Sequence, residues 1–151
     1  MKTRIVDYRP PRIAQALVLA AALLHWATPL KQVQVYSGQG PGLFLGAAGF
    51  AVMRWGWWLF RKHDTAICPS AQPRRLVASG IYRLSRNPMY LGMVAMLFGL
   101  ALFVGSFPFY LAAAIYLVVI DRFFCAYEER RLTETFGDEY LDYRNRVRRW
   151  I

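Results

Sequence analysis

The fold of this chain is decided by one uncharged stretch, Met89 to Ile120, which reads MYLGMVAMLFGLALFVGSFPFYLAAAIYLVVI. A helix needs about 20 apolar residues to cross about 30 Å of hydrocarbon. The Ser106-Phe107-Pro108 break divides the stretch, and Pro108 suits the first turn of a helix because the N–H that it lacks would have no intrahelical partner there. The stretch therefore predicts a tight hairpin, with one helix from Met89 to Gly105 and a returning helix that runs through Ile120.

Two further apolar stretches precede this hairpin, from Ile13 to about Leu30 and from Pro41 to Phe60. Only a helix satisfies its own backbone hydrogen bonds inside hydrocarbon without closing into a barrel, and no alternation of apolar and polar residues favours strands. The chain is therefore expected to be an all-α integral membrane protein with about four transmembrane helices and a single domain over residues 1–151. We expect the first stretch to be a signal anchor and not a cleaved signal peptide.

Composition and charge agree with a membrane protein. The 151 residues are 56% apolar and 19% charged, with a formal net charge of +10, and this apolar content excludes a disordered chain. Basic residues alternate between the segments that flank the apolar stretches, which predicts that both termini and the 61–87 segment are cytoplasmic. Because the positive charge follows the membrane sides, no nucleic-acid partner is expected.

The cytoplasmic side should carry two polar helices after the hairpin. The sequence from Asp121 keeps helix-forming composition up to Gly137, which predicts a helical extension into the cytosol that carries Glu128 and Glu129. Gly137 is expected to cap this extension, and a second helix of mixed charge should begin at Asp138. That last helix is expected to lie on anionic lipid, with basic and aromatic residues at the interface: Arg144, Arg146, Arg148, Arg149 and Trp150.

A second motif stands at the cytoplasmic mouth of the Met89 helix, where Ser85-Arg86-Asn87-Pro88-Met89-Tyr90 precedes the apolar residues. Asn87 is held out of the helical region by the proline that follows it, and Pro88 suits the first helical turn, so a helix begins here. The positive end of the helix dipole favours an anion at such a terminus. Arg86 beside it can bind a carboxylate or a phosphate with two parallel hydrogen bonds.

Two spaced motifs carry a resemblance to a known superfamily. The first is Thr65-Ala-Ile-Cys-Pro69, followed by Gly80-Ile-Tyr82 and Ser85-Arg86-Asn87-Pro88-Met89-Tyr90-Leu-Gly92, and the second is Glu128-Glu129-x-x-Leu132-x-x-x-Phe136-Gly137-x-Glu139-Tyr140-x-x-Tyr143-x-x-x-Val147. In this order, with the hairpin between them, they resemble the isoprenylcysteine carboxyl methyltransferase and phospholipid methyltransferase superfamily. They span roughly the last 90 residues, and the first 60 residues add only topology.

The resemblance implies a membrane-embedded methyltransferase that uses S-adenosylmethionine and releases S-adenosylhomocysteine. It also implies that the cofactor lies at the cytosolic ends of the last two transmembrane helices, between two walls of residues. One wall would consist of Tyr82, Arg86, Asn87, Pro88, Tyr90 and Gly92, and the other of Glu128 and Glu129. An arginine and two carboxylates can answer the charged groups of the cofactor, and the tyrosine rings can face its sulfonium or its adenine.

The methyl acceptor stays open at this point, although a lipophilic molecule that enters from the bilayer is expected. A carboxylate acceptor needs an arginine to orient it, for which Arg144 or Arg146 is predicted, with Glu139 fixing that arginine. An amine acceptor must lose a proton, and Glu139 or Glu129 would then be the base. Prenylated cysteine carboxylates, phospholipid amines and small lipophilic acids or amines all suit such a site.

Two other functions, a steroid-reductase-like enzyme and a non-catalytic scaffold, fit the same residues less well. A steroid-reductase-like enzyme typically has a glutamate directly after the Tyr-x-Gly motif, where this chain has Met93, and a non-catalytic scaffold would not require the combined motifs. No metal site is predicted because His, Cys, Asp and Glu show no ligand spacing. Arg54 is expected either to reach the interface or to join the site, and His25 to be an interfacial or packed histidine. The protein is expected to be a possible homodimer.

Overall fold

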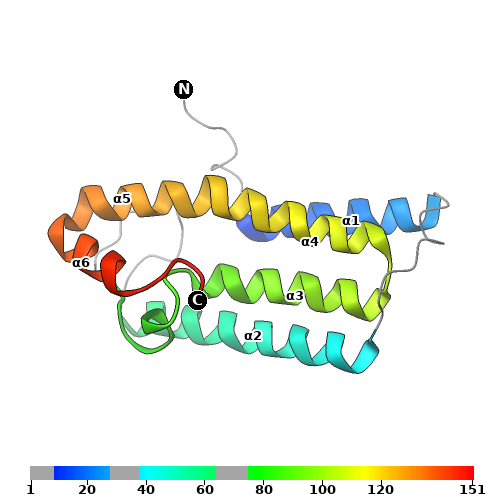
Figure 1. The fold of residues 1–151 in the computed structure, drawn as a ribbon, viewed down its shortest axis with the longest axis horizontal. Coiled ribbons are helices and arrows are strands. Elements are labelled where there is room, and N and C mark those ends of the chain that lie inside the picture. The colour runs from blue at the N-terminus through cyan, green and yellow to red at the C-terminus, as the bar shows by residue number, and fades with distance from the viewer. Residues whose placement is uncertain (1–8, 28–37, 64–74) are drawn as a thin grey trace.

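The computed structural model describes residues 9–27, 38–63 and 75–151, and all regular secondary structure in these ranges is helical. The elements are α1 (Pro10–Ala27), α2 (Gln39–Lys62), a short 3-10 turn (Gly80–Arg83), α3 (Pro88–Val104), α4 (Phe107–Val119), a π-helical turn (Ile120–Cys125), α5 (Ala126–Phe136) and α6 (Asp138–Arg146). Figure 1 shows α1 to α4 as a bundle, with α5 and α6 projecting beyond one end. The Thr65–Pro69 part of the first motif and the end of the first apolar stretch lie outside the described residues.

The hairpin that the sequence predicts is confirmed. Helix α3 ends at Gly105, whose φ of 69° lies in the left-handed region that glycine adopts without strain, and α4 begins at Phe107. Pro108 stands in the first turn of α4. At this end His25 is packed as expected, because its Nδ1 lies 2.9 Å from Oγ of Ser106.

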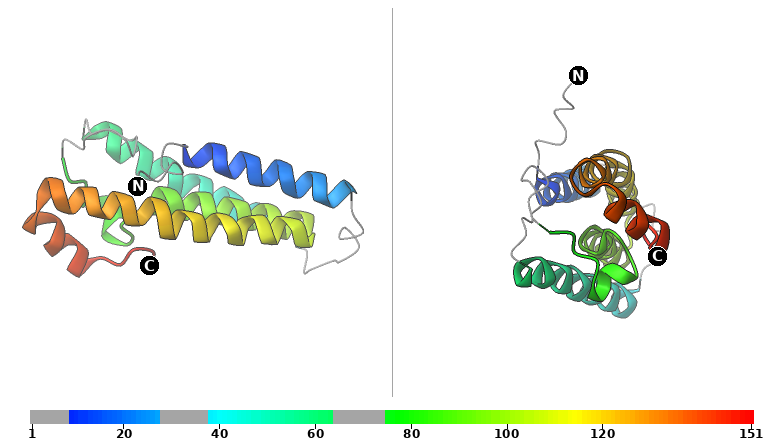
Figure 2. Two further views of the ribbon diagram at one scale, coloured as in Figure 1. Left: turned by 90° about the horizontal axis from the view of Figure 1, so that it is seen from above. Right: turned by 90° about the vertical axis from the view of Figure 1, so that its left-hand side faces the viewer.

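Helices α2 and α3 lie side by side along their length and approach closely (Figure 2). Their contact is made by glycines. A Cβ built at Gly49 would lie 2.6 Å from the carbonyl oxygen of Gly92, and one built at Gly99 would lie 2.6 Å from the backbone N of Gly46. Small residues that let two backbones touch are the usual means by which helices associate in membranes, where the lipid is as apolar as the side chains.

Two helices are long and apolar enough to cross a membrane, namely Gln39–Lys62 and the continuous helix Phe107–Phe136. Helix α3 is apolar but shorter, at 17 residues. Large apolar side chains on the outside of the bundle, such as Trp26, Phe44 and Val118, are exposed as a lipid-facing surface requires. The complete four-span topology stays a prediction.

The extension beyond the bundle is confirmed, because α4 runs through the π-helical turn into α5 without a break. Gly137, with a φ of 52°, ends α5, and α6 begins at Asp138 as expected. Helix α6 then folds back towards the start of α3 and buries Tyr140 and Tyr143 (Figure 1).

The prediction that Arg149 and Trp150 contact lipid headgroups is wrong. Arg149 Nη1 lies 2.9 Å from Oδ1 of Asp121, and Trp150 Nε1 donates to the same oxygen at 3.0 Å. The C-terminal segment, residues 147–151, therefore packs against the π-helical turn. The reason is the carboxylate of Asp121, which accepts hydrogen bonds from both Arg149 and Trp150 and so holds these side chains against the protein.

Candidate active site

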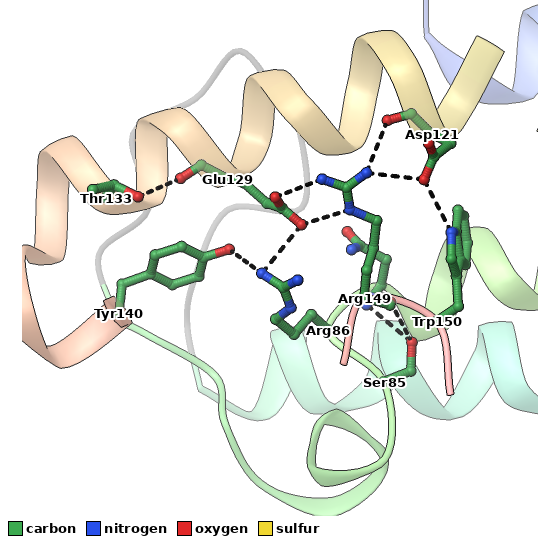
Figure 3. Close-up of polar contacts among 9 residues, drawn as sticks. Ser85, Arg86, Asp121, Glu129, Thr133, Tyr140, Arg149 and Trp150 are labelled. Atoms are coloured by element: carbon green, nitrogen blue, oxygen red, sulfur yellow. Dashed lines mark hydrogen bonds and ion pairs between the residues drawn. The ribbon is translucent and has the colours of Figure 1, made fainter. Parts of the chain in front are cut away.

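The two predicted walls meet at the end of the bundle through an ion-pair network (Figure 3). Arg86 Nη1 lies 3.2 Å from Oε1 of Glu129 and donates to the hydroxyl of Tyr140 at 3.4 Å. Arg149 binds the same carboxylate with two hydrogen bonds, from Nε to Oε1 at 2.8 Å and from Nη2 to Oε2 at 2.7 Å. Glu129 is only 8% exposed, so its charge is buried between two guanidinium groups.

The corner before α3 is built as the sequence indicates. Asn87 caps α3 with φ of −130°, and Pro88 is the first helical residue. The backbone N–H of Asn87 donates to Oγ of Ser85 at 3.2 Å, which fixes the turn between Arg86 and the helix. Nearby, the hydroxyl of Tyr143 donates to the carbonyl oxygen of Tyr82 at 2.6 Å and thus joins α6 to the Gly80–Arg83 turn.

The second glutamate lies on the same side of α5 and faces α3. The Tyr90 hydroxyl donates a hydrogen bond to Oε1 of Glu128. Arg86 and Tyr90 from one motif therefore each contact one of the two adjacent glutamates of the other motif. The two motifs, which are far apart in the sequence, are therefore in direct contact across the site.

A cavity of about 610 Å³ lies between these groups. Its polar side includes Tyr82, Arg86, Asn87, Tyr90, Glu128 and Glu129, and its apolar side includes Met53, Trp57, Phe60, Met89, Met93 and Leu132. Cavities of this size, mostly apolar with a few polar groups, are typical sites for small molecules. The cavity is large enough for a nucleoside-sized ligand and part of an acceptor.

Three buried polar atoms at this cavity have no hydrogen-bond partner within the described residues: the Tyr82 hydroxyl, Nε of Arg86 and Nδ2 of Asn87. A buried donor without a partner costs free energy, so such atoms are usually satisfied by water or by a ligand. Burial also raises the pKa of the Tyr82 hydroxyl well above its ordinary value, so this group stays a neutral donor. The donors suit the carboxylate and the hydroxyls of an amino-acid nucleoside such as S-adenosylmethionine.

Residues 40–139 match the family described as phospholipid methyltransferase, and this region includes both predicted walls of the cavity but not Tyr140, Tyr143 or the C-terminal segment, residues 147–151. The chain belongs to the phospholipid methyltransferase family. It is thus a member of a family of membrane methyltransferases, and its Arg86 corner and its two glutamates lie inside the matched region.

Two curated relatives match this family member. An uncharacterized protein of Haemophilus influenzae is 40% identical over 63 residues, which are 42% of this chain and 100% of that protein. Protein-S-isoprenylcysteine O-methyltransferase B of Arabidopsis thaliana is 34% identical over 76 residues, which are 48% of this chain and 37% of the plant protein. The chain thus matches little more than a third of the plant enzyme's length. No solved structure matches the chain at a significant level.

Five residues that the sequence analysis assigned to the site do not line the cavity. Pro88 is buried at the start of α3, and Gly92 faces α2, where a Cβ would meet Met53. Glu139, Arg144 and Arg146 are exposed on α6, because this helix turns Tyr140 and Tyr143 towards the cavity and its charged residues outwards. Arg146 Nε donates to the carbonyl oxygen of Asp142 on its own helix at 3.2 Å.

Tyr140 and Tyr143 line the cavity but were not predicted as site residues from the sequence. Tyr140 is 1% exposed and its hydroxyl accepts from Arg86, and its pKa is raised by burial and by the charge of Glu129. The i, i+3 spacing of Tyr140 and Tyr143 is a signal that could have found them, because it places both on one helix face. Arg54 lines the cavity and stacks on Trp57, with its guanidinium 4.4 Å from the ring centroid. Its reach to the membrane interface stays a prediction.

Proposed function

We propose that this protein is a membrane methyltransferase that uses S-adenosylmethionine and transfers the methyl group to a lipophilic acceptor, with S-adenosylhomocysteine as the second product. The observation that carries the proposal is the cavity at which the Arg86–Tyr90 corner meets Glu128 and Glu129. Donors on Tyr82, Arg86 and Asn87 have no hydrogen-bond partner there among the described residues. The family match supports the class of reaction.

Different residues of the cavity suit different parts of the cofactor. Nε of Arg86 and Nδ2 of Asn87 suit an anionic or hydroxyl oxygen, and Glu128 suits an ammonium or a ribose hydroxyl. The rings of Tyr82, Tyr90 and Trp57 offer faces for adenine or for a sulfonium. When bound, the cofactor would supply a methyl group on a positively charged sulfur, and this sulfur would leave as a neutral thioether when the acceptor forms its bond to the methyl carbon. The chain's own contribution is to align the acceptor and to exclude water.

For the acceptor we propose a carboxylate on a lipophilic molecule, as in isoprenylcysteine carboxyl O-methylation, because the structure leaves the two bases expected for an amine poorly placed. Both oxygens of Glu129 are held by arginines, and Glu139 is exposed outside the cavity. A carboxylate needs no base near neutral pH. Arg54, exposed at the cavity, is the arginine that we expect to orient it, in place of Arg144 or Arg146.

A phospholipid or small-amine N-methyltransferase is the second candidate. The observation that favours it is Glu128, a half-buried glutamate that lines the cavity and accepts a hydrogen bond from Tyr90. This carboxylate could accept a proton from an amine. In both cases we expect the cavity to face the cytoplasm, with the protein integral to the membrane.

Binding of S-adenosylhomocysteine by detergent-purified protein, measured by isothermal titration calorimetry, tests the cofactor. The wild type should bind, and Tyr82→Phe should bind about tenfold more weakly, because it removes a hydroxyl that has no hydrogen-bond partner in the described ranges of the chain. Tyr116→Phe is the control for the loss of a buried tyrosine hydroxyl, since Tyr116 is buried and does not line the cavity, and its hydroxyl already has a partner in Sδ of Met93 at 3.4 Å. Equal affinities in wild type and Tyr82→Phe would contradict the assignment of this wall.

Transfer of a radiolabelled methyl group to two model acceptors distinguishes the two chemistries. A farnesylated cysteine with a free carboxylate should be methylated, whereas phosphatidylethanolamine should not. Arg54→Gln should raise the KM for the carboxylate acceptor and leave S-adenosylhomocysteine binding unchanged. Methylation of phosphatidylethanolamine alone would select the N-methyltransferase and overturn the role of Arg54.

A further inference from the structure

The C-terminal segment, residues 147–151, joins the two walls of the site. The carbonyl oxygen of Arg148 accepts from the amide of Arg86 at 3.0 Å, and the carbonyl oxygen of Arg149 accepts from Oγ of Ser85 at 3.0 Å. The backbone of the segment is therefore attached to the corner before α3. Its Arg149 side chain points the other way, to α5 and the π-helical turn (Figure 3).

Arg149 fixes both oxygens of Glu129 at once. A fork of two parallel N–H···O bonds defines the plane of a carboxylate as well as its position. The distances of 2.8 Å to Oε1 and 2.7 Å to Oε2 leave Oε1 facing Nη1 of Arg86 at 3.2 Å. Arg149 thus decides where Arg86 finds its ion-pair partner, although Arg149 itself does not line the cavity.

The π-helical turn makes this double contact possible. Asp121 and Glu129 are eight residues apart, and eight residues of a regular α-helix would leave their side chains about 80° apart around the axis. A π-helical turn takes in about one extra residue, so the eight residues complete close to two full turns. Both carboxylates then face the same side, and one guanidinium reaches both, with Nη1 2.9 Å from Asp121 and Nη2 2.7 Å from Glu129.

Arg86 and Arg149 face Asp121 and Glu129 in this group, and the exposed Arg122 lies 3.6 Å from Asp121 on its outer side. Without the Arg149 fork, Glu129 has Arg86 as its nearest cation. The guanidinium of Arg86 is then drawn fully onto this buried carboxylate. Its Nε, which is buried at the cavity without a partner in the described chain, is turned away from a ligand.

We propose that Arg149 is a positioning residue that holds Glu129, and through it Arg86, in the geometry that binds the cofactor. Arg149 is therefore part of the functional site, although it lies outside the region that matches the family. This proposal rests on the proposed function, because it concerns the binding of the same cofactor.

The test is a double-mutant cycle on S-adenosylhomocysteine affinity in detergent, with the variants Arg149→Lys, Arg86→Lys and the double variant. Lysine keeps the charge but cannot form the fork. Arg149→Lys should lower the affinity about tenfold, which corresponds to the loss of one charged hydrogen bond. Because both residues act on one contact, the double variant should bind no more weakly than the weaker single variant.

Trp150→Phe is the matched control on the same segment. It removes the hydrogen bond from Nε1 to Asp121 and leaves Arg149 in place, so it should lower the midpoint of thermal unfolding and keep the affinity within about twofold of wild type. Wild-type affinity in Arg149→Lys, equal losses in Arg149→Lys and Trp150→Phe, or additive losses in the cycle would overturn the positioning role alone. Absence of binding by the wild type would overturn the proposed function and this proposal together.

Discussion

The length of helix α3 and its start are held to their neighbours in two different ways. Along its length α3 contacts α2 through glycines, so that backbone lies on backbone and no polar side chain is needed. At its start, α3 is joined to α5 and to the C-terminal segment by arginines and carboxylates. The first contact depends on shape and the second on charge. The glycine contact therefore suits the part of the molecule in lipid, and the charged one suits the part where a polar ligand must bind.

The charged end should be the more sensitive to a single substitution. Glu129→Gln removes the buried charge that the guanidinium groups of Arg86 and Arg149 share, and we expect it to destabilise the protein by about 3 kcal/mol. Thermal unfolding in detergent measures the loss. Glu134→Gln is the control, because Glu134 is an exposed glutamate on the same helix. Equal stability of the two variants would mean that the network contributes nothing.

The glycine contact should respond to a single methyl group at one position and not at another. Gly49→Ala places a Cβ 2.6 Å from the carbonyl oxygen of Gly92 and should cost about 2 kcal/mol by forcing the helices apart. Gly46→Ala, one turn earlier on α2, meets nothing within 4 Å and should be neutral or slightly stabilising. Unfolding of both proteins in the same detergent compares them, and similar midpoints would show that α2 and α3 are not in backbone contact.

A single neutral hydrogen bond at the polar end should have a smaller effect. Tyr143→Phe removes the donor to the carbonyl oxygen of Tyr82 and should cost about 1 kcal/mol. Because that bond holds the Gly80–Arg83 turn at the cavity, we expect S-adenosylhomocysteine affinity to fall with it. A loss of stability with unchanged affinity would separate the turn from the binding site.

The smallest effect is expected on the outer face of α6. Arg144→Ala changes an exposed side chain outside the cavity, so methyl transfer and stability should stay within the error of measurement. A clear loss of methyl transfer at unchanged cofactor affinity would restore the catalytic role that the sequence suggested for this arginine.

The comparison also explains which features could be predicted from the sequence. The hairpin at Gly105–Pro108, the start of α3 at Asn87–Pro88 and the end of α5 at Gly137 depend on the local preferences of glycine and proline, and all three are confirmed. The approach of Arg86 to Glu129 followed from the resemblance. The bond of Arg149 to Asp121 did not, because it joins residues 28 positions apart and depends on a π-helical turn that no local pattern predicts.

One consequence follows from the unbroken helix Phe107–Phe136, whose 30 residues extend about 45 Å. Its first half lies among the apolar helices and its second half carries Glu128 and Glu129, so a change in its tilt moves both glutamates relative to Arg86. Bilayer thickness sets the tilt of a spanning helix. Reconstituted into vesicles of increasing acyl-chain length, the enzyme should therefore work best at one thickness, and the host membrane becomes a determinant of its turnover.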